Sequence, residues 1–299
     1  MNKKGSIVTI GVFDGVHIGH QAVIKKAVKK ARLYGLKSIV VTFDPHPLKV
    51  LDPRHFIPSL ISLDHRIGLI KKSGIDEVFV MKFSKKTANI SPEVFIEDVI
   101  INKMRAREIV VGEDFYFGRG ARAGVKKLRE IAEKRSVKVE IVKPVRKNSY
   151  IVSSTIIRRL VLEGRVREAE HLLGRPYSIL GTVVSGTKLA RKLGYPTANV
   201  NPHHEAIPPS GVYAVKVRSG GKTYGGIMNI GVRPTFYDHG HDKEPTIEVH
   251  IFNFHKKIYG KDLEIRFVRK IRDERRFKAR DRLIEQIKKD ERSAKALLR

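Results

Sequence analysis

The chain has no cysteine and no tryptophan, and none of its apolar runs approaches the roughly 20 residues needed to cross a bilayer. The lack of cysteine excludes a disulfide framework, a thiolate nucleophile and a cysteine-ligated zinc site, so any chemistry must rest on oxygen, imidazole, amine and backbone groups. The N-terminus leads directly into a strand-like segment and carries no cleavable signal pattern. These absences predict a cytoplasmic protein with no membrane partner, and they leave its oligomeric state open.

Acidic residues are also scarce, with 31 Asp and Glu against 60 Lys and Arg, which gives a formal net charge of +29 at pH 7. Such a charge attracts polyanions, so a basic nucleic-acid-binding protein is one alternative. The net positive charge is +17 over residues 1–180 and +12 over residues 181–299. Because it is spread over both halves of the chain, it forms no basic tail or arm. Because no RNA-recognition, zinc-finger or basic-zipper signature accompanies it, nucleic acid is not the expected partner.

Enough apolar material remains for a packed core, since 41% of the 299 residues are hydrophobic. In the first half, short apolar runs alternate with helical patterns. Strands are predicted at residues 6–10, 38–43, 77–81, 108–111 and 137–142, and helices at 21–34, 92–103 and 126–134. The β-branched runs favour an α/β fold with a parallel sheet covered on both faces, in which a nucleotide site is expected at the carboxyl ends of the strands.

The pattern changes near residues 174–176, where short strands separated by Gly, Pro, Asn and Ser turns begin. The predicted strands are residues 178–184, 212–217, 223–229, 246–252 and 263–268. Strands of this length and spacing indicate a small antiparallel barrel or sandwich. An amphipathic helix is predicted to end the chain at residues 279–298, so the sequence predicts two domains, 1–174 and 175–299.

The most informative stretch is residues 11–20, GVFDGVHIGH, where the first strand gives way to the first helix. If the helix has started by His17, then His17 and His20 share a face near its amino end, where free N–H groups and the helix dipole favour anions. Gly15 and Gly19 let a phosphate approach the backbone closely. The stretch therefore predicts a triphosphate cradle with two hydrogen-bond donors placed where charge builds as pyrophosphate leaves an α-phosphorus.

At this motif the sequence resembles the bifunctional riboflavin kinase/FAD synthetases, whose first domain is a nucleotidyltransferase of the His-x-Gly-His class. Further stretches carry the resemblance in the right order: TFDPHP (42–47), VVGEDFYFG (110–118), VSSTIIR (152–158), LGYPTAN (193–199), NIGVRPTF (229–236), TIEVHIFNF (246–254) and RDERRF (272–277). The resemblance implies a Rossmann-like nucleotidyltransferase domain followed by a small antiparallel β-barrel kinase domain with a C-terminal helix. It implies riboflavin, FMN and ATP as ligands, with phosphorylation of riboflavin to FMN and adenylylation of FMN to FAD.

For the first domain, the resemblance implies that His17, His20 and Arg158 are catalytic. It implies nucleotide contacts at Gly11, Phe13, Asp14, Gly15, Gly19, Ser154 and Thr155, and flavin contacts at Asp114 and Phe115. A Ser or Thr at a helix start followed by Arg one turn later is a workable anion clamp. Without the family, Asp114 reads equally well as a turn residue and Phe115 as a core aromatic.

For the second domain, the resemblance implies that Thr197 and Asn199 hold the Mg²⁺ bound to ATP, a cation that prefers hard oxygen donors. It implies that Glu248 is the base for the riboflavin 5′-hydroxyl. Glu248 alternates with His250 and Phe252 on one face of its strand, where an unpaired carboxylate is costly. Gly186 is expected at the nucleotide, and Arg272 and Glu274 are expected beside the flavin or as residues that order a loop. An exposed ion pair is an equally plausible reading of Arg272 and Glu274.

One departure from the family pattern concerns the phosphate loop of the second domain, which reads Gly186-Thr187-Lys188-Leu189-Ala190-Arg191. The family has an acidic residue after the first Gly and a second Gly before the Arg. An alternative is therefore an FMN adenylyltransferase with a weak or inactive kinase half. The histidine motif is expected to contact only ATP, so it does not identify the second substrate. An adenylyltransferase for a nicotinamide or pantetheine phosphate is therefore a further alternative.

Overall fold

The computed structural model describes residues 5–54, 57–186, 194–232, 245–275, 277 and 279–299. Contacts divide the chain into two compact units. The first holds the residues up to Ser59 and Leu63–Ser154, and the second holds Leu60–Ser62 and Thr155–Arg299. The predicted boundary between residues 174 and 175 stays a prediction, since the helices just before it are grouped with the second unit.

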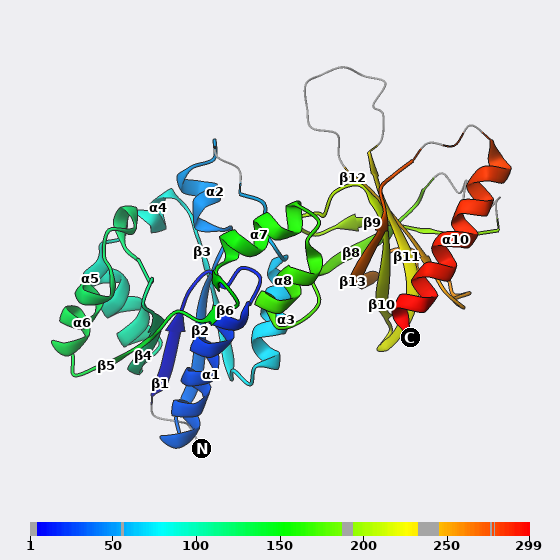
Figure 1. The fold of residues 1–299 in the computed structure, drawn as a ribbon. Helices are drawn as coiled ribbons and strands as arrows, with labels where there is room; N and C mark the ends of the chain where they lie inside the picture. The colour runs from blue at the N-terminus through cyan, green and yellow to red at the C-terminus, as the bar shows by residue number, and fades with distance from the viewer. Residues whose placement is uncertain (1–4, 55–56, 187–193, 233–244, 276, 278) are drawn as a thin grey trace. The chain divides into compact units, whose positions relative to one another are not determined.

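The first unit is built on a five-stranded sheet in which every paired strand is parallel (Figure 1). The strand order is β3-β2-β1-β4-β5. The strands are β1 (Ser6–Ile10), β2 (Lys37–Asp44), β3 (Glu77–Lys82), β4 (Ala106–Gly112) and β5 (Lys138–Val142), and a short hairpin of β6 (Arg146–Lys147) and β7 (Tyr150–Ile151) follows. All five carboxyl ends lie at one edge of the sheet, as the sequence predicts for an α/β fold.

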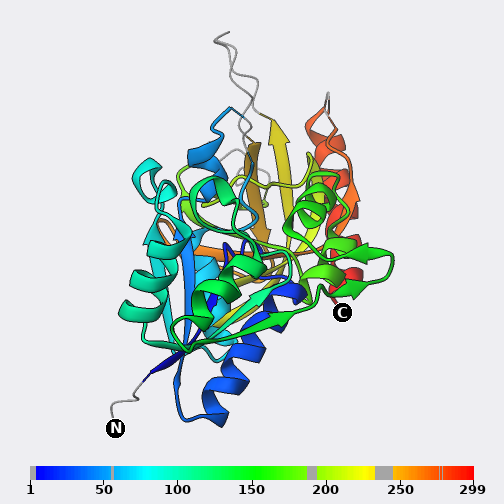
Figure 2. The ribbon, with the colours of Figure 1, turned by 90° about the vertical axis from the view of Figure 1, so that its left-hand side faces the viewer.

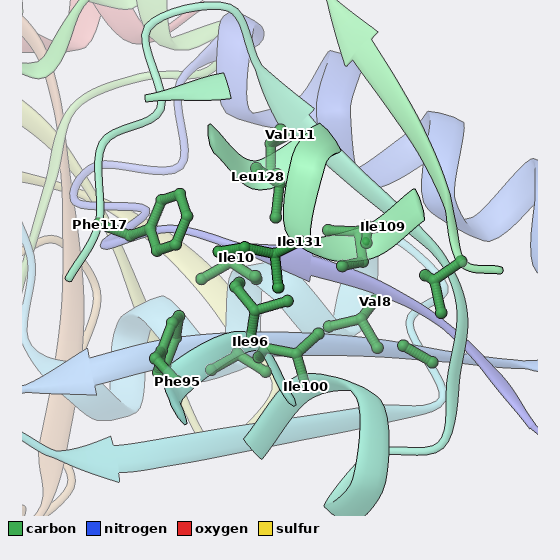
Figure 3. Packing of buried hydrophobic residues seen from close by; sticks show 14 of the residues in the cluster. Val8, Ile10, Phe95, Ile96, Ile100, Ile109, Val111, Phe117, Leu128 and Ile131 are labelled. Atoms are coloured by element: carbon green, nitrogen blue, oxygen red, sulfur yellow. The ribbon is translucent and has the colours of Figure 1, made fainter. Parts of the chain in front are cut away.

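Helices cover both faces of this sheet. Successive residues of a strand point to opposite faces, and Val8 and Ile10 pack against the π-helix η1 (Phe95–Lys103) and α6 (Val125–Glu133), as Figure 3 shows. Ile7 packs on the other side against α1 (Ile18–Leu33). The buried face of α1 consists of the five predicted residues Val23, Ile24, Ala27, Val28 and Ala31. The remaining helices of this part are α2 (Pro47–Leu51), α3 (Leu63–Lys72), α4 (Lys85–Ala88), α5 (Pro92–Val94) and the 3₁₀ turn η2 (Arg119–Ala121).

The second unit is a closed antiparallel barrel in the order β10-β11-β12-β9-β8-β13. Its strands are β8 (Ser178–Val184), β9 (Ala198–Pro202), β10 (Gly211–Ser219), β11 (Lys222–Val232), β12 (Pro245–Ile251) and β13 (Asp262–Arg272). Two helices precede it, α7 (Ser154–Leu162) and α8 (Val166–Leu173), and α8 contacts β13. The barrel confirms the predicted second fold.

The last helix, α10 (Arg280–Leu298), lies along the outside of the barrel, as Figures 1 and 2 both show. Its Ala294 packs with Ala214, Ile227 and Phe252, and Ile287 and Leu297 border this cluster. The predicted terminal helix is confirmed. Among the described residues, no helix has both the length and the apolar character that a membrane span requires.

Several elements lie outside the sequence-based expectation, namely α2, α3, α4, α8 and the β6–β7 hairpin, and two further regions differ from it. The predicted helix at 92–103 is a short α-helix followed by the π-helix η1, whose wider turn places Phe95, Ile96 and Ile100 on the face that packs against the sheet. Strand β9 has no counterpart in the prediction, because Pro196-Thr197-Ala198-Asn199 reads as a turn. Its pairing with β8 and β12 outweighs that local preference, and this strand carries one predicted metal ligand.

Candidate active sites

The first site lies in the loop that joins β1 to α1. Three of its residues have positive φ, namely Phe13 (54°), Gly15 (80°) and Val16 (41°), and the Val16 N–H donates to the Phe13 carbonyl at 3.1 Å. Left-handed backbone at two non-glycine residues is unfavourable and needs support from surrounding contacts. The tight turn brings His17 to the amino end of α1, as the sequence predicts.

His17 is the N-cap of α1, since its Nδ1 accepts a hydrogen bond from the His20 N–H at 3.2 Å. A ring nitrogen that accepts a hydrogen bond carries no proton, so the proton of His17 sits on Nε2 and makes that atom a donor. The two imidazoles stack, with ring centroids 3.5 Å apart and planes inclined by 19°. His17 is buried and His20 is half-buried.

Two glycines of the motif leave room that side chains would fill. A Cβ at Gly19 would lie 3.1 Å from Nδ1 of His17, and a Cβ at Gly11 would lie 3.0 Å from the Phe13 ring. Phe13 in turn meets the His20 ring edge-on, with centroids 5.2 Å apart. The glycines therefore keep the histidine pair and its aromatic support in place.

The surroundings of His20 lower its pKa well below the usual value. Burial is the largest cause, followed by His17 and then the cation of Arg66. Sequence reasoning did not single out Arg66, which lies on α3 with 5% of its surface exposed. The signal that points to it is its place four residues before the buried Ile70 on the same helix face.

The second predicted phosphate-binding turn, at Ser154 and Thr155, is joined to this loop by one hydrogen bond. The Ser154 hydroxyl donates to the Asp14 carbonyl at 2.8 Å, and Asp14 is 3% exposed. Ser154 is the first residue of α7, and Thr155 and Arg158 follow on that helix. In the first unit, the structure thus joins the predicted nucleotide residues Asp14 and Ser154.

The predicted flavin residues Asp114 and Phe115 follow β4, which is the neighbour of β1 in the parallel sheet. They therefore lie at the same sheet edge as the histidine loop. Phe115 stacks on the buried Phe117, with centroids 5.4 Å apart and planes inclined by 10°. Asp114 is exposed, and its Oδ1 lies 2.7 Å from where a Cβ of Gly112 would be.

The second site lies on three neighbouring strands of the barrel. Glu248 on β12 pairs directly with Asn199 on β9 and with Asn229 on β11, so the three side chains point to the same face of the sheet. Glu248 is half-buried, and the Thr197 hydroxyl donates to its Oε2 at 3.4 Å. The prediction from sequence did not assign a role to Asn229. Its place opposite the predicted base is visible only in the strand register.

The turn that carries Thr197 is held by His250, the residue two places after Glu248. His250 Nδ1 lies 2.8 Å from the Pro196 carbonyl oxygen, so this nitrogen carries the proton and donates it. The Tyr195 ring contacts His250 edge-on, with centroids 5.4 Å apart. His250 shares a strand face with Glu248, as predicted, whereas Phe252 lies just beyond the end of β12.

Gly186 follows β8 and lies against the predicted metal ligand. A Cβ on Gly186 would be only 1.9 Å from Asn199 Nδ2, so this position leaves no room for any side chain. The rest of the phosphate loop, residues 187–191, lies outside the described residues, and so do residues 233–236 of the NIGVRPTF stretch. The departure at Thr187 and Ala190 is therefore untested.

Arg272 and Glu274 occupy different environments. The Arg272 guanidinium makes hydrogen bonds of 2.7 to 3.0 Å to the buried carboxylate of Asp290 on α10, and its NH1 donates to the Asp273 carbonyl at 2.9 Å. Arg272 therefore orders the segment that leads to Glu274. Oε1 of Glu274 lies 2.6 Å from where a Cβ of Gly231 would be, near Thr246 and Asn229.

Comparison with protein families gives two matches along the chain. Residues 1–156 match the FAD synthetase family model, and residues 173–298 match the riboflavin kinase family model. The two matches cover the sheet with the histidine motif and the barrel with Glu248, respectively.

Relatives of known description match over nearly the whole chain. A bifunctional riboflavin kinase/FMN adenylyltransferase of Listeria monocytogenes is 39% identical over 97% of this chain and 91% of that protein. One from Bacillus subtilis is 38% identical over 97% and 91%. Among solved structures, one from Streptococcus pneumoniae described as a macrolide-efflux protein is 33% identical with a TM-score of 0.86, over 99% of this chain and 95% of that chain.

Proposed function

The chain belongs to the bifunctional riboflavin kinase/FMN adenylyltransferase family, and from this membership we propose which of its residues carry each reaction. The enzyme phosphorylates riboflavin to FMN with ATP, and it adenylylates FMN to FAD with release of pyrophosphate. The comparisons favour neither a nucleic-acid-binding protein nor an adenylyltransferase without a kinase half. We assign FAD formation to residues 1–174 and riboflavin phosphorylation to residues 175–299, and we expect both to run in the cytoplasm, where ATP is made.

In FAD formation, a phosphate oxygen of FMN attacks the α-phosphorus of ATP, and pyrophosphate leaves without a covalent enzyme intermediate. The stacked pair at the start of α1 is the observation that supports this assignment. His17 presents an Nε2–H donor, and His20 lies beside it at the helix end where anions are favoured. Donors of this kind contribute about 10²- to 10³-fold each to the rate when they stabilise developing charge.

The other predicted residues of this half bind and orient the two substrates. Gly11 and Gly19 leave room for the Phe13 and His17 rings, Gly15 supplies a left-handed turn, and we assign all three to the phosphates. Phe13, Asp14 and Ser154 fix the shape of the loop. Thr155 and Arg158 follow on α7, where Arg158 supplies positive charge for the triphosphate. Asp114 and Phe115 lie at the same sheet edge and are assigned to the flavin of FMN.

The ATP-dependent reactions of this family imply a divalent metal ion, and we assign Mg²⁺. Among the described residues, no cluster of three or more His, Asp and Glu side chains offers a ligand-rich cage. The Thr197 hydroxyl and the Asn199 amide oxygen fit an ion that takes few ligands from protein and prefers hard oxygen donors. When bound with ATP, the ion neutralises phosphate charge. The close approach of Gly186 to Asn199 sets the place of the amide.

In riboflavin phosphorylation, Glu248 orients the riboflavin 5′-hydroxyl and accepts its proton as the oxygen attacks the γ-phosphorus of ATP. The carboxylate is half-buried, and the one side-chain hydrogen bond that it accepts from the described part of the chain is the long one from Thr197. It is therefore available to a substrate hydroxyl. Glu274 is assigned to the riboflavin side, and Arg272 orders the segment that carries it.

A single assay tests the assignment of the first site. The purified protein is incubated with riboflavin, ATP and Mg²⁺, and FMN and FAD are separated by chromatography. The wild type should form both products, and the double variant His17→Ala, His20→Ala should accumulate FMN with FAD formation reduced by at least about 10³-fold. Undiminished FAD formation in the double variant would overturn the role of the histidines and leave the kinase assignment intact.

A further inference from the structure

Arg66 is a buried cation at the carboxyl edge of the sheet, outside every motif that the sequence singles out. It lies on α3 and is 5% exposed. A guanidinium is removed from water only at a large cost unless hydrogen bonds and charges compensate it. Its NH1 donates to the Val12 carbonyl at 2.8 Å, and its NH2 donates to the Phe43 carbonyl at 2.9 Å. The cation thus connects the loop after β1 to the end of β2.

Nearby carboxylates partly compensate the charge. Oδ1 of Asp44 lies 3.9 Å from NH2 of Arg66, and Asp14 also attracts the cation. Burial lowers the pKa of Arg66, while the two carboxylates oppose that change. An arginine stays charged at neutral pH even so. A fixed positive charge on α3 therefore lies against the loop that holds the histidines.

The carbonyl that Arg66 holds is the one just before the strained part of this loop. The Val12 carbonyl also accepts a hydrogen bond from the Thr42 hydroxyl at 2.9 Å. The next residue, Phe13, has a φ of 54°, and its ring supports His20 edge-on. The Thr42 hydroxyl and the Arg66 guanidinium both donate to the Val12 carbonyl, so they fix the orientation of the Val12–Phe13 peptide. This orientation supports the left-handed backbone of Phe13. A chain of contacts therefore runs from Arg66 through Val12 and Phe13 to His20.

We propose that Arg66 is a positioning residue for FAD formation: it holds the Val12 and Phe43 carbonyls, and thereby fixes the Phe13 ring that supports His20 in its stacking on His17. The proposal rests on the role assigned above to the histidines. Arg66 is a positioning residue and not a catalytic one, because only 5% of it is exposed and two of its nitrogens are committed to backbone oxygens. Its charge acts on His20 directly as well, in the direction that favours the neutral ring.

The test compares Arg66→Met and Arg66→Lys with Lys72→Met, an exposed position on the same helix. In Arg66→Met, we expect kcat for FAD formation to fall by about 10²-fold, because a small displacement of a catalytic group is enough for such a loss. The KM for ATP should change less than kcat. The riboflavin kinase rate of the same molecules should be unchanged, which shows that the barrel unit is folded, and circular dichroism at the same protein concentration checks the first unit. Arg66→Lys should recover part of the loss, since Lys can reach one carbonyl, and Lys72→Met should behave as the wild type.

A double-mutant cycle with His20→Ala separates positioning from a general structural effect. If Arg66 acts through His20, the loss from Arg66→Met should largely vanish in the His20→Ala background, whereas an unrelated structural defect would add to it. Additive losses, or an unchanged kcat in Arg66→Met, would overturn the proposal. If His20→Ala alone costs nothing, the histidine assignment itself fails, so the two failures are distinguishable. Should Arg66→Met not fold, the same cycle is run with Arg66→Lys and with Thr42→Val, which removes the second donor to the Val12 carbonyl.

Discussion

His17 and His20 stack face to face at the start of α1, with ring centroids 3.5 Å apart. Two imidazolium rings in this arrangement would repel one another, and His17 must be neutral at Nδ1 to accept the His20 N–H. In the role that we propose, the pair therefore acts through hydrogen-bond donors with little positive charge of its own. If phosphates bind here as we propose, the positive charge beside them must come from arginine and from the helix end.

The lowered pKa of His20 predicts a pH dependence of stability. Burial, His17 and Arg66 all disfavour its protonated form in the folded chain, while the unfolded chain takes up the proton near pH 6.5. Below that pH the unfolded state binds more protons, so the stability present above about pH 6.5 is lost as the pH falls, by up to about 1.4 kcal/mol per pH unit. Urea unfolding at pH 5, 6 and 7 measures this slope. The variant His20→Gln should flatten it, and equal slopes in the two proteins would contradict the prediction.

Glu248 should be needed for one of the two reactions only. In Glu248→Gln the amide keeps the size of the side chain and cannot take a proton, so riboflavin phosphorylation should fall by about 10²- to 10⁴-fold. FAD formation from supplied FMN should be unchanged, because the first site has its own residues. The exposed Glu285→Gln on α10 is the matched control. A normal kinase rate in Glu248→Gln would remove the assignment of the base.

Gly186 should tolerate no side chain. Since a Cβ there would lie 1.9 Å from Asn199 Nδ2, Gly186→Ala must displace the amide assigned to the metal ion. Overpacking of this kind costs about 1–3 kcal/mol of folding stability. Because the displaced amide is assigned to the metal ion, we also expect the kinase kcat/KM to fall by about 10²-fold. FAD formation should not change. The control is Gly68→Ala on α3, where the added Cβ meets no heavy atom within 4 Å. Equal kinase rates in the two variants would show that Asn199 has room to move.

Much of the fold could be predicted because periodicity reports burial directly. The buried face of α1 is the predicted one, residue for residue, and β1 and β8 have the predicted bounds. The sequence did not reveal β9, since the Pro-Thr-Ala-Asn stretch favours a turn and becomes a strand only through pairing with β8 and β12. Local pattern carries no information about such long-range partners.

The same limit applies to the sites. His17, His20 and Glu248 could be proposed from the sequence because each lies within a short motif. Asn229 and Arg66 could not, because what singles them out is a contact with a residue 19 or 54 positions away, at Glu248 and Val12. A strand register and a helix packed over a sheet edge create these contacts. Neither appears in a linear pattern.

The last prediction concerns whether Arg272 contacts riboflavin or holds α10. Its guanidinium bonds Asp290 through two nitrogens, and Gln286 also donates to that carboxylate, at 2.8 Å. Removing one partner of a buried ion pair costs about 3–5 kcal/mol. We therefore expect Arg272→Ala and Asp290→Ala to destabilise the barrel by similar amounts, and the double variant to be little worse than either.

The kinetic measurement then separates the two roles. If Arg272 acts by ordering the segment that carries Glu274, both variants should raise the KM for riboflavin by the same factor, because both release that segment. If Arg272 touches the flavin itself, Arg272→Ala should raise the KM far more than Asp290→Ala. We expect the equal effect, since every nitrogen of the guanidinium already donates to Asp290 or to the Asp273 carbonyl. The exposed Arg282→Ala on α10 is the control for loss of positive charge.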